Sequence, residues 1–367
     1  MNGVPVQVQD LGGAGVVVGV DTHQLVHVAA VIDSRFARLG DREFPATAAG
    51  YQALVQWACS FGPVAGFGVE STGSYGAGLT RHLLTRHLSH KTGEVGAFEV
   101  FEVNRPEKAT RVRHGKSDPV DAYSAAEQVL TARASGRPKV RTGIVEAIRT
   151  IKVPRDAAVK NRTAAYSQLR DLITAASGKL HDDLIGLSGK KRVARILTWR
   201  PDPHRIADPD HAVRHALRAL ARRITYLDGE IAEADKHLTA LVEQACPTLL
   251  AMPQVGVQCA ARLVISAGEN INRMRTEASF AKLVGVAPLP ASSGKTHRHR
   301  LNPGGDRQAN SALYMITVGR MRSHEETRAY VERRRAEGLT TPEIIRCLKR
   351  HLARSVYNAL RTDLMTT

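Results

Sequence analysis

The chain has few cysteines and no long apolar run, and both absences exclude whole classes of protein. Its 367 residues include four cysteines, none in a CxxC spacing, which argues against a disulfide framework or a zinc knuckle. No stretch approaches the roughly 18 consecutive apolar residues that a membrane span requires. The N-terminal segment lacks a basic stretch followed by an apolar one, so no secretion signal is expected. We therefore expect a soluble, cytoplasmic protein that has no membrane partner.

Acidic residues are scarce relative to basic ones. There are 35 Asp and Glu against 52 Lys and Arg, a formal net charge of +17 and a pI near 10.1. The imbalance is uneven, because residues 1–150 hold 16 basic and 14 acidic side chains whereas residues 151–367 hold 36 and 21. A nearly neutral front half joined to a strongly basic back half indicates a polyanionic partner. Nucleic acid is favoured over a basic surface that serves solubility alone.

Strand and helix patterns alternate through the first 130 residues. Strands are predicted at 16–24, at 26–33, around 42–44, at 64–71 and at 97–103, and helices at 47–61, 76–87 and 119–134. The order β-β-β-α-β-α-β-α predicts a mixed sheet flanked by helices. This is the order expected of an RNase H-like α/β domain, which we assign to residues 1–150.

The middle of the chain is predicted to be helical. Between Val213 and Leu241 the apolar residues follow one another in alternating steps of four and three, the heptad pattern of a coiled coil. A helix at about 156–176 carries a matching stripe. The two helices form either an antiparallel hairpin within the chain or a coiled coil between protomers, and we favour a hairpin that also helps the protein to oligomerise. Residues 151–246 are thus a coiled-coil region, and residues 247–367 a mostly α-helical domain that ends in a helix at about 342–360.

Four carboxylates in the front half stand at the ends of predicted elements. Asp21 ends the first strand, Glu70 ends the fourth, and Asp118 and Asp121 lie three residues apart at the start of a helix, on one helical face. If the two strands are neighbours, the four acids converge and repel one another unless a cation neutralises them. Oxygen ligands favour Mg²⁺ or Mn²⁺. His23 follows Asp21 closely and could assist the acids or bind the metal, but a lone histidine beside a strand end is more often a surface residue.

A loop of small residues, PASSGKTHRHR, presents a serine doublet beside a basic cluster. Spacing alone favours a turn beside a strand that binds phosphate, and a nucleophilic serine is the alternative. A second basic stretch, SGKKRVARILTWRP, lies in the middle region and contains Trp199. The candidate nucleic-acid contacts in these stretches and in the following GGDR are Lys190, Lys191, Arg192, Lys295, Arg298, Arg300 and Arg307.

These motifs together resemble the IS110 family of insertion-sequence transposases. GVDTHQ, VESTGSY, KSDPVDA and LVGVAPLPASSGKTHRHRLNPGGDRQAN each match a family signature, in the family's order and over nearly the whole chain. The chain departs from the pattern at Gln24, where Lys is common. It departs again at Gln254, where the turn of a DNA-binding helix-hairpin-helix usually has Gly.

The resemblance implies the roles of the site residues and the partners. Asp21, Glu70, Asp118 and Asp121 would be the metal-binding acids of a RuvC-like domain. Ser293, with Ser292 as the fallback, would be the nucleophile that becomes linked to DNA in the C-terminal transposase domain. Family members act as homo-oligomers, here a dimer or a tetramer, whose composite sites take the acids from one protomer and the serine from another. They use a non-coding bridge RNA that pairs with donor and target DNA.

Two other functions compete with a transposase that exchanges DNA strands. A RuvC-like nuclease, such as a junction resolvase, would use the same acids to activate water and would need no serine. A non-enzymatic nucleic-acid-binding protein would keep the acids for structure alone. The presence of all four acids speaks against the second of these, and the long basic half that carries the serine speaks against the first.

Overall fold

The computed structural model describes residues 15–85, 98–103, 117–134, 136–176, 178–290, 299–300 and 302–365. The chain packs into two compact units. Unit 1 comprises Met1–Gly143 with Gly268–Arg275, and unit 2 comprises Ile144–Ala267 with Thr276–Thr367. The sequence suggests three domains instead, at 1–150, 151–246 and 247–367. That division stays a prediction.

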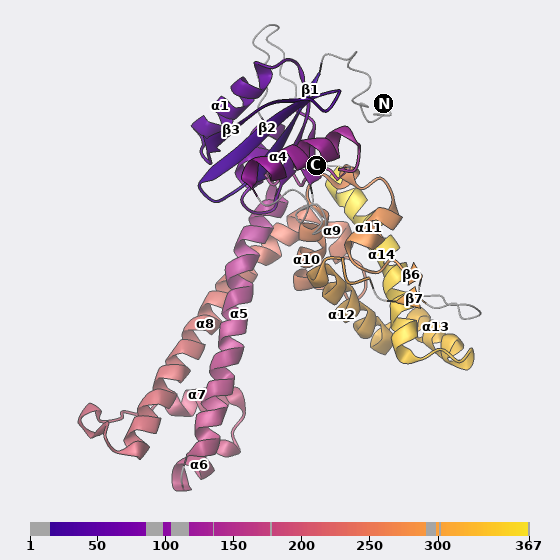
Figure 1. Cartoon of the computed structure of the whole chain (residues 1–367). Coiled ribbons are helices and arrows are strands. Elements are labelled where there is room, and N and C mark those ends of the chain that lie inside the picture. Colours follow the sequence, from indigo (N-terminus) through magenta and orange to yellow (C-terminus); the bar gives the residue numbers. More distant parts are fainter. Residues whose placement is uncertain are drawn as a thin grey trace. The chain divides into compact units, whose positions relative to one another are not determined.

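Unit 1 is built on a five-stranded mixed sheet (Figure 1). Its strands are β1 (Val16–Thr22), β2 (Val26–Asp33), β3 (Arg38–Pro45), β4 (Val64–Glu70) and β5 (Val100–Val103), in the spatial order β3-β2-β1-β4-β5. The first three strands pair antiparallel, whereas β4 lies parallel to both β1 and β5. The predicted order of strands and helices is therefore confirmed, and the mixed sheet is compatible with an RNase H-like fold.

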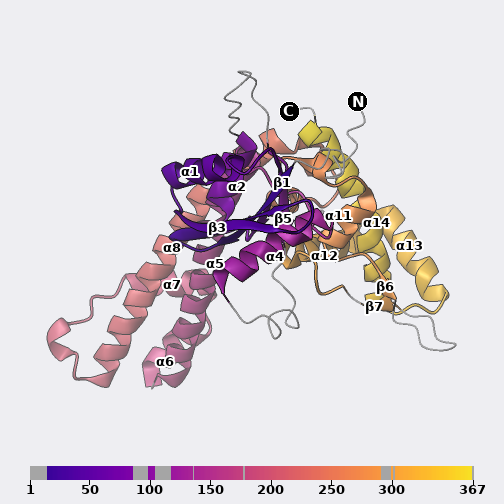
Figure 2. The same cartoon turned by 45° about the horizontal axis from the view of Figure 1, so that its top comes forward.

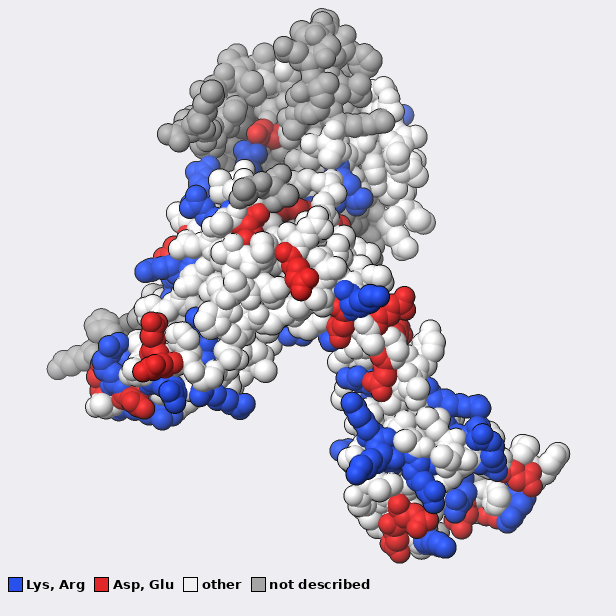
Figure 3. Space-filling model, turned by 180° about the vertical axis from the view of Figure 1, so that it is seen from behind, with Lys and Arg blue, Asp and Glu red and all other residues white. Residues whose placement is uncertain are grey.

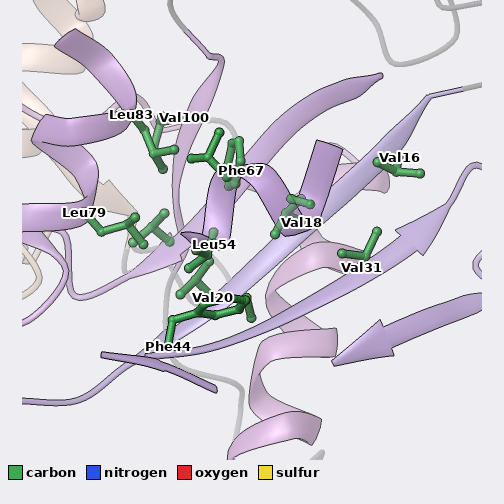
Figure 4. Close-up of a cluster of buried hydrophobic side chains, with 14 residues drawn as sticks. Val16, Val18, Val20, Val31, Phe44, Leu54, Phe67, Leu79, Leu83 and Val100 are labelled. Atoms are coloured by element: carbon green, nitrogen blue, oxygen red, sulfur yellow. The ribbon is translucent and has the colours of Figure 1, made fainter. Parts of the chain in front are cut away.

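Helices cover both faces of this sheet because alternate strand residues are apolar on both sides. On one face, Val18, Val20 and Phe67 pack with α1 (Ala48–Cys59) and α2 (Ala77–Thr85) in the cluster of Figure 4. On the other, Val17 and Ile32 pack with α4 (Asp118–Leu130), which contributes Ala122, Ala125, Ala126 and Val129. The side on which a residue points therefore decides which helix it meets.

Small residues let α4 lie unusually close to the sheet. A Cβ atom at Gly19 of β1 would come within 2.0 Å of the Ala122 carbonyl oxygen and 2.3 Å of the Ala126 nitrogen. A Cβ atom at Gly68 of β4 would come within 2.7 Å of the Ala125 oxygen. The two glycines thus allow backbone-to-backbone approach between α4 and the central strands.

Unit 2 contains a long antiparallel helical hairpin. Helices α5 (Ile144–Ala175) and α8 (Pro209–Ala245) lie side by side in both views (Figures 1 and 2). Leu169 and Ile173 of α5 pack against Leu217, Ala221 and Ile224 of α8. The pairing within one chain confirms the hairpin, whereas association between protomers stays a prediction.

The helix predicted at about 156–176 is longer than expected, because α5 begins at Ile144 and runs through Pro154. A proline inside a helix removes one backbone hydrogen bond and usually ends the helix. Here Ile148 is fully buried on the near side of the proline, and the buried Lys152 donates to Asp156 across it at 3.0 Å. Packing and this bond hold the two halves in one helix, a tertiary effect that local sequence does not reveal.

Ion pairs between the two hairpin helices fix their register. The Arg155 guanidinium donates to both carboxylate oxygens of Asp235, at 2.9 and 3.3 Å, and Arg162 donates to Asp228 at 2.7 Å. Two such pairs, seven residues apart on each helix, repeat the heptad spacing. A slip by one turn would break both.

The far end of the hairpin carries two short helices, α6 (Gly178–Ile185) and α7 (Gly189–Leu197), and a 3₁₀ turn, η2 (Pro203–Arg205). Val193 and Ile196 of α7 pack against the hairpin core, and Trp199 is partly buried against it. This packing holds α7 against α8.

The rest of unit 2 is a cluster of helices: α9 (Pro247–Leu250), α10 (Val257–Ala267), α11 (Glu277–Leu283), α12 (Arg307–Ser323), α13 (Glu325–Ala336) and α14 (Thr341–Met365). The final predicted helix is confirmed and extends to Met365. In the turn between α9 and α10, Gln254 has a φ of 63°, the left-handed conformation that a glycine adopts easily. Within the described ranges, every helix is too short or too polar to cross a bilayer.

A segment that we call the strap, Gly268–Arg275, leaves unit 2 and packs in unit 1. The Glu269 carboxylate accepts hydrogen bonds from the backbone of Gly143 at 2.9 Å and of Arg141 at 3.3 Å. The Asn270 side chain donates to the Pro138 carbonyl at 2.9 Å. Ile271 and Met274 are buried, so the strap completes unit 1 with both polar and apolar contacts.

Candidate metal centre and nucleic-acid contacts

The strand register brings two of the four predicted acids to one edge of the sheet. Val20 of β1 pairs with Val69 of β4, and Asp21 and Glu70 each follow that pair. Because side chains alternate along a strand, Asp21 shares the face of Gly19 and Glu70 shares the face of Gly68, the face that α4 covers. Both carboxylic acids are buried, with 6% and 5% of their surface exposed.

Helix α4 supplies the other two acids from its first turn. Pro119 fits here because the first helical turn does not need its missing N–H. Asp118 and Asp121, three residues apart, share one helical face. Asp121 is 6% exposed, whereas the Asp118 side chain is 47% exposed. The close approach at Gly19 therefore sets how near these acids come to Asp21.

His23 links the strand to the helix. Its Nε2 lies 3.2 Å from Oδ2 of Asp21 and 3.4 Å from Oδ2 of Asp118. Ligand atoms of Asp21, His23 and Asp118 all lie within 4.8 Å of one another, the spacing of a metal site. The His23 side chain is 49% exposed, as a surface histidine would be, and it also contacts two of the acids, which agrees with the other interpretation, that it assists them or binds the metal. The only sequence signal was its position two residues after Asp21.

The electrostatics of this edge suit a cation. Burial raises the pKa of the Asp21 carboxyl above its ordinary value; His23 opposes this shift, and the nearby carboxylates of Asp121 and Asp118 add to it. A positive ion at the same place would lower the cost of keeping these buried groups charged. The two carboxylates of Asp21 and Asp118 and the His23 imidazole form a donor set that fits Mn²⁺ or Mg²⁺, with the oxygen atoms as the preferred ligands.

The four predicted acids are not equally placed around this cluster. Asp21 and Asp118 belong to it, and Asp121 is close enough to repel Asp21. Glu70 lies on the same face of the sheet, and its backbone oxygen accepts from the Thr22 hydroxyl at 3.2 Å. A ligand role for all four acids stays a prediction.

The serine doublet lies outside the described residues, but the two ends of its segment are placed. Leu289 and Pro290 in β6 (Leu289–Pro290) pair antiparallel with Arg300 and His299 in β7 (His299–Arg300). Ser292, Ser293, Lys295 and Arg298 fall on residues 291–298, which connect the two strands, so the calls on these four residues also lie outside the described residues. The roles of the serines stay a prediction.

The chain on either side of this segment is held by tight backbone contacts. A Cβ atom at Gly305 would lie 2.3 Å from the Cα atom of Gly285, which has a φ of +69°. The Asn310 amide donates to the carbonyl oxygens of Val284 and Gly285, at 2.9 and 3.1 Å. The buried Lys349 donates to the Asn310 oxygen at 2.9 Å. Side chains of α12 and α14 therefore fix the loop before the segment.

Among the basic residues predicted to contact nucleic acid, some side chains are exposed and one is hydrogen-bonded within the protein. Lys190 and Lys191 on α7 are exposed, as are Arg300 on β7 and Arg307 at the start of α12. Arg192 donates to the carbonyl oxygens of Leu184, Ile185 and Leu187, at 2.9–3.1 Å. Through these bonds the Arg192 side chain connects α7 to the end of α6.

Two family models match the chain. Residues 18–177, which include most of β1, all of α4 and the first hairpin helix, match a model described as a transposase and named for DEDD transposases of IS110. Residues 246–332, which include β6 and β7, match a model described as the transposase IS116/IS110/IS902 family. Both matches cover segments that hold predicted site residues.

Two relatives come from insertion elements. A 43.6 kDa protein of insertion element IS110 from Streptomyces coelicolor is 30% identical over 146 residues, which are 39% of this chain and 36% of that protein. A 42 kDa protein of insertion element IS900 from Mycobacterium paratuberculosis is 22% identical over 290 residues, 67% of this chain and 72% of that protein. The match to the first relative thus covers about a third of its length.

Proposed function

Because the chain belongs to the IS110 family of transposases, we propose that it is an enzyme that cleaves and exchanges DNA strands for an insertion element. The observation that carries this proposal is the convergence of Asp21, His23 and Asp118 within 4.8 Å at the edge of the sheet. We take the mixed sheet of unit 1 as a RuvC-like domain, whose chemistry depends on such acids.

In this proposal, Asp21, Glu70, Asp118 and Asp121 hold Mg²⁺ or Mn²⁺. Such an ion, when bound, supplies positive charge that stabilises the oxygens attacking and leaving a phosphorus atom. The buried Asp21 and Asp121 are positioned by the sheet and by α4, so they need little reorganisation when the ion binds. His23, exposed between Asp21 and Asp118, orients both carboxylates.

The nucleophile is the hydroxyl of Ser293, with Ser292 as the fallback. Its Oγ gives up a proton and forms a bond to phosphorus, while the bond from phosphorus to the leaving DNA oxygen breaks and that oxygen takes a proton. Attack by a hydroxyl end of another strand reverses these changes and releases the serine, so no phosphodiester is lost to water. The exposed Arg300 and Arg307 both follow the segment in the chain and are suited to hold phosphate oxygens.

We also propose the partners that the family pattern implies. The protein acts as a homo-oligomer, a dimer or a tetramer, in which acids of one protomer and the serine of another form one site. A non-coding bridge RNA from the ends of the element selects donor and target DNA. The excess positive charge of residues 151–367 supports binding of both nucleic acids, because 36 basic side chains stand against 21 acidic ones there.

A covalent adduct tests the mechanism directly. The full chain is incubated with the candidate RNA, Mg²⁺ and element-end DNA, and products are separated under denaturing conditions. We expect a protein–DNA adduct that Ser293→Ala abolishes and that Asp21→Asn strongly reduces. Asp182→Asn is the matched control, since this carboxylate on α6 is 78% exposed and lies outside the acid cluster.

The same experiment separates the alternatives. If the Ser293→Ala protein formed the adduct and the Ser292→Ala protein did not, Ser292 would be the nucleophile. Free nicked DNA from both serine variants would show attack by water and would favour a RuvC-like nuclease. Binding without any cleavage, in a protein that also fails to bind Mn²⁺, would favour a non-enzymatic role.

A further inference from the structure

The far end of the hairpin is strongly basic. Residues 178–223 hold 11 Lys and Arg against 5 Asp and Glu. Figure 3 shows Lys and Arg side chains gathered on one face of the end that carries α6 and α7. A surplus of this kind is common on exposed surfaces, so the arrangement of individual side chains decides whether it forms a site.

Three arginines of α8 follow one another at four-residue steps. Arg214, Arg218 and Arg222 are neighbours along one side of the helix, with about 6 Å of helix rise between each pair. Tyr226, 73% exposed, continues the row. Because α8 is held by its packing against α5, the row is presented on a stiff support.

A fourth arginine joins this row from the segment that follows α7. Arg200 donates to the carbonyl oxygens of Leu197 and Trp199, at 3.3 and 3.1 Å, which fixes it at the end of that helix. The Arg214 guanidinium lies 5.1 Å from the centre of the Trp199 ring. Burial lowers the pKa of Arg218, and the charges of Arg222 and Arg200 lower it further, so these three cations lie near one another.

These arginines differ from four others on the hairpin in having no acidic partner among the described residues. Arg155, Arg162, Arg170 and Arg205 each lie within 4 Å of an Asp carboxylate. Within the described part of the chain, no carboxylate lies within 4 Å of Arg200, Arg214, Arg218 or Arg222. Neighbouring like charges without a counter-charge are costly to hold together and are relieved when anions bind.

We propose that Arg200, Arg214, Arg218 and Arg222 form a phosphate-binding face that holds the backbone of duplex DNA along the far end of the hairpin. The choice of DNA rests on the proposed function, in which DNA is the substrate. Guanidinium groups bind phosphate oxygens with two parallel hydrogen bonds, and a row of them on a stiff helix can contact several phosphates of one duplex. Such contacts fix position and carry no base sequence.

Salt dependence of DNA binding tests this face in the full chain. The affinity for a 30-base-pair duplex of unrelated sequence is measured by fluorescence anisotropy at several salt concentrations. Arg218→Gln with Arg222→Gln should remove two phosphate contacts, so the slope of log affinity against log salt should fall in magnitude by about 1.8. If the variant and the parent bind equally at 1 M salt, the affinity at about 0.1 M salt should fall roughly 60-fold.

The matched control carries the same charge change on the same hairpin. Arg170→Gln with Arg205→Gln removes two arginines that are paired with Asp171 and Asp208, and the slope should change by less than about 0.5. Arg218→Lys with Arg222→Lys should keep most of the slope. Circular dichroism checks folding, and Arg222→Gln alone, at an exposed residue, should lower the slope by about 0.9 if the double variant misfolds.

The outcomes separate this inference from the proposed function. An unchanged slope, or an equal loss in the control pair, would overturn the inference and leave the adduct experiment untouched. A loss confined to an RNA duplex of the same length would also overturn it and would make RNA the occupant. The expected fall in slope would stand even if no adduct formed with any DNA, and in that case only the proposed cleavage would fail.

Discussion

At the scale of single residues, sequence reasoning found the acids more easily than their partner. Asp21 and Glu70 stand at strand ends and Asp118 and Asp121 share a helical spacing, so position alone singled them out. His23 lies between two strands, where no helical or strand periodicity shows which way its side chain points. Its role between Asp21 and Asp118 depends on α4 lying next to β1, a contact between residues about 95 positions apart.

A pH-dependent prediction concerns the Glu277 carboxylate of α11, which accepts hydrogen bonds from Arg350 and Arg354 of α14 at 3.0–3.2 Å. The hydrogen bonds from Arg350 and then Arg354 lower the pKa of Glu277 to about 2. A carboxyl whose folded pKa lies below its unfolded value stabilises the protein above roughly pH 4 and loses this effect as the pH falls towards 2. Glu277→Gln should therefore lower the melting temperature at pH 6, and the deficit should shrink between about pH 4.5 and pH 2.

Thermal melts followed by circular dichroism at pH 6, 4 and 3 measure this deficit. Glu243→Gln on α8 is the control, since this side chain is exposed and forms no ion pair with a described residue. It should melt like the parent at each pH. A deficit of the same size at pH 6 and pH 3 would rule out the Glu277 ion pairs as its cause.

At the scale of elements, the approach of α4 to β1 connects stability to the acid cluster. Gly19→Ala places a methyl group against the backbone of α4, which cannot give way as a flexible side chain would. We expect the free energy of unfolding to fall by roughly 1–3 kcal/mol or more. Mn²⁺ binding should weaken as well, because α4 carries Asp118 and Asp121.

Urea denaturation and a Mn²⁺ titration followed by electron paramagnetic resonance check the two effects. Gly229→Ala is the matched control, because a Cβ atom there meets nothing within 4 Å on the exposed side of α8. It should raise the free energy of unfolding by about 0.5–1 kcal/mol and leave Mn²⁺ binding unchanged. A Gly19→Ala protein with the stability and the Mn²⁺ affinity of the parent would contradict the close packing.

Elements were predictable from the sequence where a local pattern decided them. A run of β-branched residues at 16–24 gave β1, and heptad steps gave the seam residues Leu217 and Ile224. The start of α5 was missed because Pro154 locally favours a helix end, whereas buried contacts on both sides of it carry the helix through. The row of arginines that lack an acidic partner among the described residues was missed too, since ion-pair partners are known only once α5, α7 and α8 are packed together.

At the scale of the whole molecule, the strap makes unit 1 depend on residues far along the chain. Glu269→Ala with Asn270→Ala should remove the hydrogen bonds to Gly143, Arg141 and Pro138, and should lower the stability of unit 1 by about 1–3 kcal/mol. Limited proteolysis of the full chain should then cut faster around residues 136–143. Glu243→Ala serves as the control, and equal cleavage rates in the two proteins would show that the strap contributes little.

The strap also limits how such proteins can be recombined with one another. The chain passes between its two units at 143–144, at 267–268 and at 275–276, so unit 1 is not one block of sequence. A chimera made by a single crossover near residue 143 would inherit its sheet from one parent and its strap from the other. Hybrids should tolerate a double exchange that carries Gly268–Arg275 along with the first 143 residues, and natural mosaics between relatives should show the same linkage of the two segments.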